Sequence, residues 1–333
     1  MIKIIFLFLI LAQIYYLSFT IKLTEKEKLD KAQKIVDNAN AKNKGKWTAK
    51  LHHRIAKMEK HSVILGAKLK EKPSPINSSS INEKTNLRRK RSIPKSFDVR
   101  TAFPACAGIV GIIQDQSSCG SCWAVSTASA LTDRYCIRQV KMGNSAPSVT
   151  DPSVYFSALD VLSCTPGMWG CDGGDPYYAW KWAKSSGVVS GTNYTWNTGC
   201  KPYPFPPYGS NSYTAPSCSS SCTSNWNIAY TKDKKFSKST GYIQNDITAI
   251  QNEIMANGSV VVVFDRTSNV YEGGHAVRMI GWGTDTYPDG TSLDYWLCAN
   301  QWNTDWGMNG YFKIVRGVNE CGIESSEISF GTF

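Results

Sequence analysis

The chain is organised around residues 114–124, with the sequence QDQSSCGSCWA. From Cys122 onward, apolar residues such as Trp123, Leu131 and Ile137 recur on one face of a helical repeat. A helix that begins at Cys122 would place its thiol beside unpaired backbone N–H groups and the positive end of the helix dipole, which favour an anion. Such surroundings lower the pKa of a thiol, and the thiolate is the nucleophilic form of cysteine. The stretch therefore predicts a nucleophilic cysteine at a helix N-terminus.

The charge of the chain is distributed unevenly. Its 333 residues predict about two units, and a hydrophobic content of 42% is enough for a substantial core. The formal net charge is +11, but residues 1–91 carry +14 and residues 92–333 carry −3. Because the basic excess is confined to the N-terminal part, we expect no nucleic-acid partner.

The first residues have the layout of a secretory signal peptide, which we place at residues 1–19. Lys3 precedes an apolar run, Ile4–Ala12, that is interrupted at Gln13. The alternative is a membrane anchor, but the run is shorter than the roughly 20 apolar residues that span a bilayer. We therefore expect a protein of the secretory pathway, lysosomal or extracellular, with no attachment to the membrane.

All 11 cysteines follow residue 105. Cysteines clustered behind a signal peptide predict an oxidising compartment and disulfide bonds, and their odd number leaves at least one free thiol. Cys119 and Cys122 form a C-x-x-C pair, so a thiol–disulfide oxidoreductase is an alternative. No further ligands at short spacing support a zinc site, and we expect no metal and no cofactor.

Residues 20–91 have the character of a removable segment. Helices are predicted from the capping box Thr24–Glu27 to about Asn38 and from Trp47 to about Lys60. A linker rich in Pro and Ser, residues 72–84, leads into the basic run Arg88–Arg91. An isolated basic run is usually a solvated loop, but the position of this one before the cysteine-rich part favours a processing site.

In residues 92–333, helical patterns come first and strand patterns follow. The predicted helices are the one from Cys122, one from Pro152 to about Ser163 capped by Asp151, Pro176–Ser185, and Ile247–Ala256. The predicted strands are Val260–Phe264, Ala276–Ile280, Tyr295–Ala299 and Gly310–Val315. Residues 203–230, rich in Pro, Ser and Tyr, predict a loop. Helices followed by strands predict an α+β chain with two lobes of different class.

A thiolate nucleophile needs a base beside it, and histidine is the usual choice. Three of the four histidines, His52, His53 and His61, precede the basic run, which leaves only His275 in the cysteine-rich part. It lies in the sequence GGHAVR. We therefore predict that His275 pairs with Cys122.

These motifs, together with YWLCANQWN at residues 295–303, resemble those of the papain-like cysteine peptidases. The resemblance implies a two-lobe fold, with a helical left lobe at roughly residues 105–205, a β-barrel-like right lobe at roughly residues 206–333, and the active-site cleft between them. The resemblance implies that Cys122 is the nucleophile and that His275 acts as acid and base. Asn300 would orient the imidazole, and Trp302 would shield the bond between them. Gln116 and the Cys122 N–H would stabilise the oxyanion.

Within that family, residues 92–333 resemble the peptidase domain of cathepsin B, for example in Gly199–Tyr203 and Trp302–Gly307. Residues 20–91 then correspond to a propeptide that blocks the cleft until it is removed, with Leu65–Gly66 as a loose match. The resemblance implies a cysteine endopeptidase made as a zymogen and acting on proteins or peptides. Its expected partners are its own propeptide and cystatin-type inhibitors, and we expect a monomer.

The residues expected from the resemblance to contact the substrate are Gly173, Gly174, Gly274, Trp302 and Ser326. Glycine permits close approach of two backbones, although a tight turn beside a disulfide would also explain Gly173 and Gly174. Ser326 stands where cathepsin B has an acidic residue. This difference predicts a preference for an apolar side chain at the second substrate position before the cleaved bond.

The chain departs from cathepsin B in three further places. The region Phe205–Ser217 has no histidine to clamp a substrate's C-terminal carboxylate, which predicts endopeptidase rather than exopeptidase activity. Gln301 replaces a serine, and the segment between Phe264 and His275 is shorter than in the family. Because of this shortening, an alternative is that the chain is a catalytically impaired homologue that binds peptides or a partner.

The resemblance also implies four disulfides. They are Cys106–Cys136, Cys119–Cys171, Cys164–Cys218 and Cys200–Cys222. Cys122, Cys298 and Cys321 would remain free. A bond between Cys119 and Cys171 would exclude the oxidoreductase alternative, because Cys122 would have no partner in its C-x-x-C pair.

Overall fold

The computed structural model describes residues 24–42, 65–72, 92–209, 212–268 and 270–333. The chain divides into two units, Met1–Glu59 and Lys60–Phe333. The predicted signal peptide, the second predicted helix of the N-terminal part and the basic run lie outside the described residues. Within these described ranges, no helix is long and apolar enough to cross a membrane.

The first unit contains helix α2 (Glu25–Lys42). Thr24 and Glu27 form the predicted capping box: the Thr24 N–H donates to Glu27 Oε2 (2.7 Å), and the Glu27 N–H donates to Thr24 Oγ1 (3.2 Å). These reciprocal bonds satisfy N–H groups that the first turn of a helix leaves unpaired. The helix extends one turn beyond its predicted end near Asn38.

The second unit contains both helices and strands. Its α-helices are α5 (Val99–Ala102), α6 (Ala107–Val110), α7 (Cys122–Lys141), α8 (Ala158–Cys164), α9 (Pro176–Ser185), α10 (Tyr230–Asp233) and α11 (Ile247–Asn257). Its strands are β1 (Phe97–Asp98), β2 (Ser239–Ile243), β3 (Val260–Ser268), β4 (Val270–Thr286), β5 (Ser292–Ala299), β6 (Tyr311–Val315) and β7 (Ile328–Thr332). The helix at Cys122 and the helices that begin at Pro176 and Ile247 are thereby confirmed.

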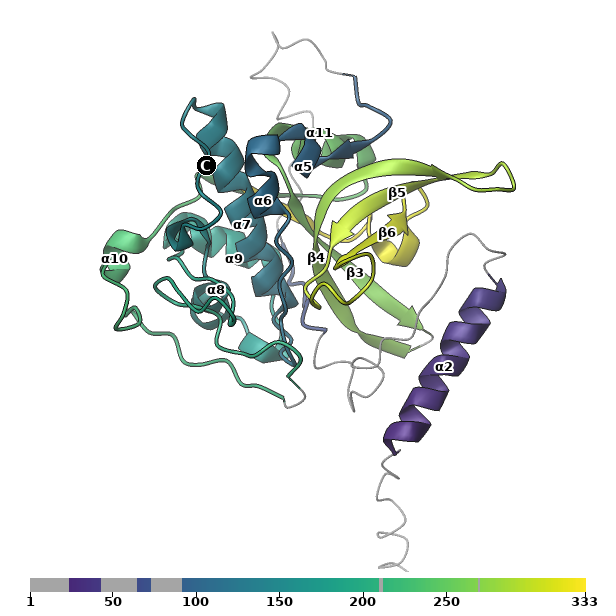
Figure 1. Cartoon of the computed structure of the whole chain (residues 1–333), viewed down its shortest axis with the longest axis horizontal. Coiled ribbons are helices and arrows are strands. Elements are labelled where there is room, and N and C mark those ends of the chain that lie inside the picture. Colours follow the sequence, from purple (N-terminus) through teal and green to yellow (C-terminus); the bar gives the residue numbers. More distant parts are fainter. Residues whose placement is uncertain (1–23, 43–64, 73–91, 210–211, 269) are drawn as a thin grey trace, which may run out of the picture. The chain divides into compact units, whose positions relative to one another are not determined.

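Helix α7 lies between the helices α8 and α9 and the sheet (Figure 1). It packs against α8 and α9 on one side and against β3 and β4 on the other. Trp123, Leu131 and Ile137 of the predicted apolar face are buried, and so are the polar side chains of Asp133 and Arg134 on the same helix. A helix in this position is covered on almost every face, so both parts of the unit fix the direction of its N-terminus.

The strands form one antiparallel sheet in the order β2-β7-β3-β4-β5-β6, and β1 pairs with β4. The sheet is open rather than a closed barrel, because its end strands β2 and β6 do not pair with each other in the described part of the chain. The four predicted strands are confirmed as parts of β3 to β6, although the last one, predicted from Gly310, begins at Tyr311. β1 has only two residues, and β2 and β7 mix Ser, Thr and Gly with few apolar residues, so their patterns gave no strand signal.

The single helix predicted from Pro152 to Ser163 is wrong. A short 3-10 turn follows Pro152, but the chain is then extended until Ser157, whose hydroxyl accepts a bond from a backbone N–H (2.9 Å) and caps α8. The N–H of Phe156 donates to the Thr132 hydroxyl of α7 (3.0 Å). Tertiary bonds to the neighbouring helix thus replace the intrahelical bonds that local sequence favours.

The described residues of the shortened segment before His275 belong to the paired strands β3 and β4. The two strands pair from Val260 opposite Met279 to Ser268 opposite Val270, with one irregularity in the register. His275 lies opposite Phe264 within this ladder. The shortening therefore leaves His275 within paired strands, where its backbone position is fixed.

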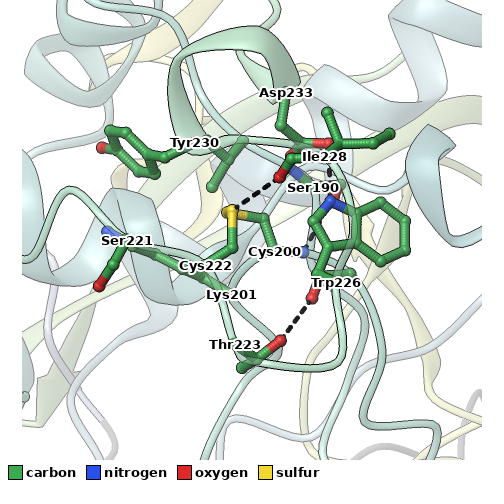
Figure 2. The surroundings of a disulfide bond; sticks show 12 residues. Ser190, Cys200, Lys201, Ser221, Cys222, Thr223, Trp226, Ile228, Tyr230 and Asp233 are labelled. Atoms are coloured by element: carbon green, nitrogen blue, oxygen red, sulfur yellow. Dashed lines mark hydrogen bonds between the residues drawn. A yellow bond between two sulfur atoms is a disulfide. The ribbon is translucent and has the colours of Figure 1, made fainter.

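The four disulfides implied by the resemblance are present. They join Cys106 to Cys136, Cys119 to Cys171, Cys164 to Cys218 and Cys200 to Cys222. Figure 2 shows the surroundings of the last one. The Thr223 N–H donates to the Cys200 carbonyl (2.9 Å), and the Trp226 indole donates to Asp233 Oδ1 (3.1 Å). This bridge anchors the end of the predicted loop, whose described residues contain no helix or strand before α10.

Replacing both Cys200 and Cys222 by Ser in a Cys122→Ala background should lower the free energy of unfolding by roughly 2–4 kcal/mol, because the bridge restricts the unfolded chain. Urea unfolding without reductant measures the change. Cys321→Ser, which replaces a cysteine outside the four disulfides, is the control and should shift the value by less than about 0.5 kcal/mol. Equal stabilities of the double variant and the control would contradict the structural role of the bridge.

Candidate active site

Cys122 is the first residue of α7 and is fully buried. Its Sγ accepts a hydrogen bond from the backbone N–H of Gly66 (3.2 Å), and the N–H of Ala276 in β4 is also directed to it. The thiol thus lies where the N-terminus of the central helix meets the strand that carries His275. The cysteine that the sequence singled out is therefore brought next to its predicted histidine strand.

His275 and Asn300 come from neighbouring antiparallel strands, with Asn300 directly after β5. The imidazole Nε2 and Asn300 Oδ1 are 2.9 Å apart. The Gln301 N–H also donates to this Oδ1 (2.9 Å), which fixes the orientation of the amide. Because Oδ1 can only accept, the bond places a proton on Nε2 and leaves Nδ1 as the nitrogen that can take a proton from a thiol.

Aromatic rings enclose the imidazole. The Trp302 ring lies over it, with centroids 4.8 Å apart and an interplanar angle of 31°. Phe264 meets it edge-on from β3, with centroids 5.7 Å apart. His275 and Asn300 are both buried. These contacts place the His275–Asn300 bond under aromatic rings, among them the Trp302 ring.

Gln116 is buried close to the same strand ends. Its backbone N–H donates to the Gln301 carbonyl (2.9 Å), and its side-chain Nε2 donates to the Cys119 carbonyl (2.7 Å). The Tyr203 hydroxyl donates to the Gln116 carbonyl (2.9 Å). The predicted oxyanion residue is therefore held by bonds from several segments, near the turn that leads into Cys122.

The sequence analysis gave Gln301 no role, yet its side chain lies beside the histidine. Its Nε2 donates to the Ala276 carbonyl (2.7 Å) and is 3.4 Å from His275 Nε2. The side chain is buried, at the position where the resemblance to cathepsin B implied a serine. The only sign of this contact in the sequence was that Gln301 stands where the resemblance implied a serine.

Residues Leu65–Lys72, the covering segment, run directly over Cys122. The N–H of Gly174 donates to the Gly66 carbonyl (2.7 Å), and the Gly174 carbonyl accepts from the Lys68 N–H (2.8 Å). On the other side, the Ala67 N–H donates to the Gly274 carbonyl (3.0 Å). Two of the glycines expected to pair with a substrate backbone thus pair here with the chain itself.

Only glycine fits at several points of this contact. A Cβ on Gly66 would lie 1.7 Å from the Gly120 carbonyl oxygen, and one on Gly174 would lie 2.4 Å from the Trp123 ring. A Cβ on Gly173 would lie 2.9 Å from the Gly66 carbonyl oxygen, at a φ of +120°. The backbone of the covering segment therefore lies as close to the peptidase backbone as two chains can.

Two acidic residues that the sequence analysis passed over lie at the end of the covering segment. The Lys72 ammonium forms ion pairs with Asp175 (2.7 Å) and with Glu327. Both carboxylates are buried. Ser326 instead lies in a turn, where its N–H donates to Gly322. Glu327, one residue later than the expected position, is therefore the residue that reaches the covering segment.

The charges of this trio depend on one another. Burial by itself would lower the pKa of Lys72, but Glu327 and Asp175 raise it above its ordinary value. Burial, and then the charge of Asp175, raise the pKa of Glu327, while Lys72 acts in the opposite direction. The ammonium of Lys72 therefore compensates part of the cost of holding two carboxylates together in a buried place.

The covered site holds Cys122 and His275 without charge. Burial raises the pKa of Cys122 to about 11, although the N–H groups of Ala276 and Gly66 act to lower it. Burial likewise lowers the pKa of His275 to about 4, although the bond to Asn300 raises it. Near pH 7 the structure therefore contains a neutral thiol and a neutral imidazole.

Comparison with known proteins identifies the class to which this fold and site belong. The model of the papain family of cysteine proteases matches residues 93–330, and the chain belongs to this family. It is a cysteine peptidase. The Cys119–Cys171 bond excludes the alternative of a thiol–disulfide oxidoreductase that uses Cys119 and Cys122.

The relatives specify the group within the family. The chain is 38% identical to cathepsin B-like cysteine proteinase 6 of Caenorhabditis elegans, over 88% of this chain and 81% of that protein. It is 35% identical to a cathepsin B-like cysteine proteinase of Schistosoma japonicum, over 85% of each. The solved structure of procathepsin B S9 from Trypanosoma congolense is 30% identical, with a TM-score of 0.70 over 90% of this chain and 97% of that one. The chain is a cathepsin B-like cysteine peptidase in its zymogen form.

Gly66→Ala in the full-length chain should lift the covering segment from Cys122, because the added Cβ overlaps the Gly120 carbonyl. The rate of Cys122 alkylation by iodoacetamide should rise roughly tenfold to a hundredfold, as expected for an overpacked contact. Leu69→Ala, in an exposed position of the same segment, is the matched control and should leave the rate unchanged. An unchanged rate for Gly66→Ala would show that the contact does not protect the thiol.

Acid should release the covering segment. In a Cys122→Ala variant no thiolate can pair with the imidazole, so the pKa of His275, about 4 when covered, returns toward its ordinary 6.5 when uncovered, and the uncovered state binds more protons between these values. The dissociation constant of a peptide of residues 60–75 for the processed Cys122→Ala variant should therefore rise as the pH falls from 6.5 to 4, by up to about a hundredfold.

Fluorescence anisotropy of the labelled peptide gives this pH profile. The same peptide with Lys72→Met is the control: its binding should be weaker at every pH but should have the same slope, because the proton is taken up at His275. A dissociation constant that is constant or falls toward acid pH would contradict the account.

Proposed function

We propose that this chain is an endopeptidase that cleaves peptide bonds through a thioester on Cys122, after the covering segment has been removed. The observation that carries the proposal is the buried His275–Asn300 pair on the strand whose next N–H, that of Ala276, is directed to the thiol. Its Nδ1 makes no hydrogen bond to any described residue and is the remaining acceptor on the ring. These groups suffice for acyl transfer to a thiol and need no cofactor.

The proposed reaction has two halves. His275 Nδ1 takes the Cys122 proton, Sγ attacks the substrate carbonyl, and the imidazolium then gives this proton to the leaving amine as the C–N bond breaks. Water next attacks the thioester with His275 as base, which releases the acid and restores the thiol. In both halves the negative oxygen would be held by the Cys122 N–H and by Gln116 Nε2.

The covered structure also suggests what must change at Gln116. Its side-chain N–H is now bonded to the Cys119 carbonyl (2.7 Å). For Gln116 to stabilise an oxyanion, the amide must offer a second N–H, or turn from this carbonyl, once a substrate carbonyl replaces Gly66. We propose that the amide is positioned by the Gln301 and Tyr203 bonds to its backbone while its side chain adapts.

The loop after Phe205 supports the preference for internal bonds. Its described residues pack through Phe205 and Tyr213, whose rings stack 4.6 Å apart, and the Ser118 hydroxyl donates to the Gly209 carbonyl. His275 is the only histidine after residue 91. The loop thus has no imidazole pair with which to bind the C-terminal carboxylate of a substrate, as an exopeptidase of this group would require.

We further propose the division of the chain into a signal peptide at residues 1–19, a propeptide at residues 20–91 and a peptidase domain at residues 92–333. The sign reversal of net charge near residue 91 and the position of the covering segment support this division. The protein would enter the secretory pathway and act in lysosomes or outside the cell, on protein or peptide substrates. Cystatin-type inhibitors and a monomeric state remain expectations from the family.

Gln116→Ala should lower kcat by about 10²–10³ with little change in KM, because the amide acts on charge that develops in the transition state. Steady-state cleavage of a fluorogenic peptide by the processed enzyme measures both constants. Cys122→Ala, which should abolish cleavage, sets the background. A loss that appears only in KM would assign Gln116 to substrate binding, and cleavage by Cys122→Ala would overturn the proposed function.

A further inference from the structure

Gln301 is bonded to three parts of the site at once. Its backbone N–H donates to Asn300 Oδ1 (2.9 Å), and its backbone carbonyl accepts the N–H of Gln116 (2.9 Å). Its side-chain Nε2 donates to the Ala276 carbonyl (2.7 Å), and the residue is only 3% exposed. Gln301 therefore links the amide that orients His275, the predicted oxyanion residue and the residue that follows the histidine.

The Gln301 side chain also brings an amide nitrogen close to the imidazole. Its Nε2 lies 3.4 Å from His275 Nε2, the ring nitrogen that donates to Asn300 Oδ1. An amide nitrogen can donate but cannot accept, so two nitrogens that both carry protons face each other. A neutral ring tolerates this contact, whereas a ring that takes a second proton and a positive charge is disfavoured by it.

The described side chains around the imidazole carry no charge that could outweigh this contact. They are Phe264 from β3 and Asn300, Gln301 and Trp302 after β5. The titratable group on the side of α7 is the Cys122 thiol, to which the N–H of Ala276 is directed. Polar contacts are stronger in a buried place than in water. The bond to Asn300 favours the charged ring, and Gln301 opposes it.

The contact does not depend on the covering segment. Strand β4, which carries His275, pairs with β5 from Arg278 opposite Ala299 onward, and Gln301 is the second residue after β5. The bonds of Gln301 go to Asn300, Gln116 and Ala276, and all three belong to the peptidase part. Removal of the covering segment therefore leaves the amide beside the ring.

We propose that Gln301 is a positioning residue that holds its amide against the His275 imidazole and thereby shifts peptide cleavage by the processed enzyme toward acid pH. This inference rests on the proposed function and names a regulation of the same site. Cleavage requires the imidazolium to protonate the leaving amine, and the imidazolium is lost as the pH rises. An amide that disfavours the charged ring lowers the pH at which this loss occurs. A serine in this position would lack the amide, and activity would persist to higher pH.

The first test measures the pKa of His275 without catalysis. Because His275 is the only histidine after residue 91, the processed enzyme has a single imidazole to titrate by NMR. In a Cys122→Ala background, Gln301→Met should raise the pKa of His275 by at least about 0.5, because it removes the amide and keeps the site filled. Gln301→Glu, which has the same length and adds a negative charge, should raise it by about 1 or more. An unchanged or lower pKa in Gln301→Met would overturn the proposal.

Gln251→Met in the same background is the matched control. Gln251 is a buried glutamine of helix α11, with an exposed fraction of 5%. The variant makes the same chemical change away from the imidazole and should leave the pKa of His275 within about 0.2 of that of the parent. An equal rise in Gln251→Met and Gln301→Met would trace the shift to a general change in packing and would overturn the role of Gln301.

The pH dependence of cleavage gives the second readout. In the processed enzyme with Cys122 intact, Gln301→Met should move the alkaline limb of kcat/KM for a fluorogenic peptide to higher pH by at least about 0.5. A merely structural role of Gln301 would lower the rate at every pH and leave the limb in place, and this result would overturn the proposal. Absence of all cleavage by the wild-type enzyme, together with the expected NMR shift, would overturn the proposed function but not the action of Gln301 on His275.

Discussion

The burial of the Cys122 thiol under the chain's own backbone is the constraint on which the rest of the structure depends. The Gly66 N–H bonded to Sγ and the pairing with Gly174 and Gly274 seal the site from water. Removal of water makes a thiolate–imidazolium pair unfavourable, so both groups are neutral in the zymogen. The same covering that blocks access thus also suppresses the reactivity of the nucleophile, and uncovering reverses both effects together.

The helices and the sheet hold the residues around the Cys122 thiol in fixed positions. Cys122 is fixed by a helix that is packed on both sides, and His275 is fixed within the ladder between β3 and β4. Asn300 and Gln301 follow the adjacent strand, and Gln116 is bonded to the same strand end. The helical part and the sheet therefore each supply half of the site. The covering segment pairs with Gly174 on the helical side and with Gly274 on the sheet side. It is therefore sensitive to any change in the relative position of these two parts.

The sequence predicted those parts of the site whose chemistry allows little choice. A cysteine at a predicted helix start and a single histidine after residue 91 were sufficient to find Cys122 and His275, and three of the four predicted helices of the peptidase part are present. The helix predicted from Pro152 failed because Thr132 of a distant helix bonds the backbone there. Asp175 and Glu327 were passed over because they are 152 residues apart and neither has a motif. Only the fold shows that one lysine lies between them.

The alkylation rate of Cys122 as a function of pH, measured site by site on the full-length chain and on the processed enzyme, tests the central claim most directly. The account predicts that the processed enzyme reacts rapidly already at pH 5 to 6, because an exposed thiol beside His275 forms an ion pair. The full-length chain should react slowly and accelerate only toward the Cys122 pKa of about 11. Identical profiles for the two forms, or a processed enzyme whose rate rises only near the ordinary thiol pKa of about 8.5, would contradict it.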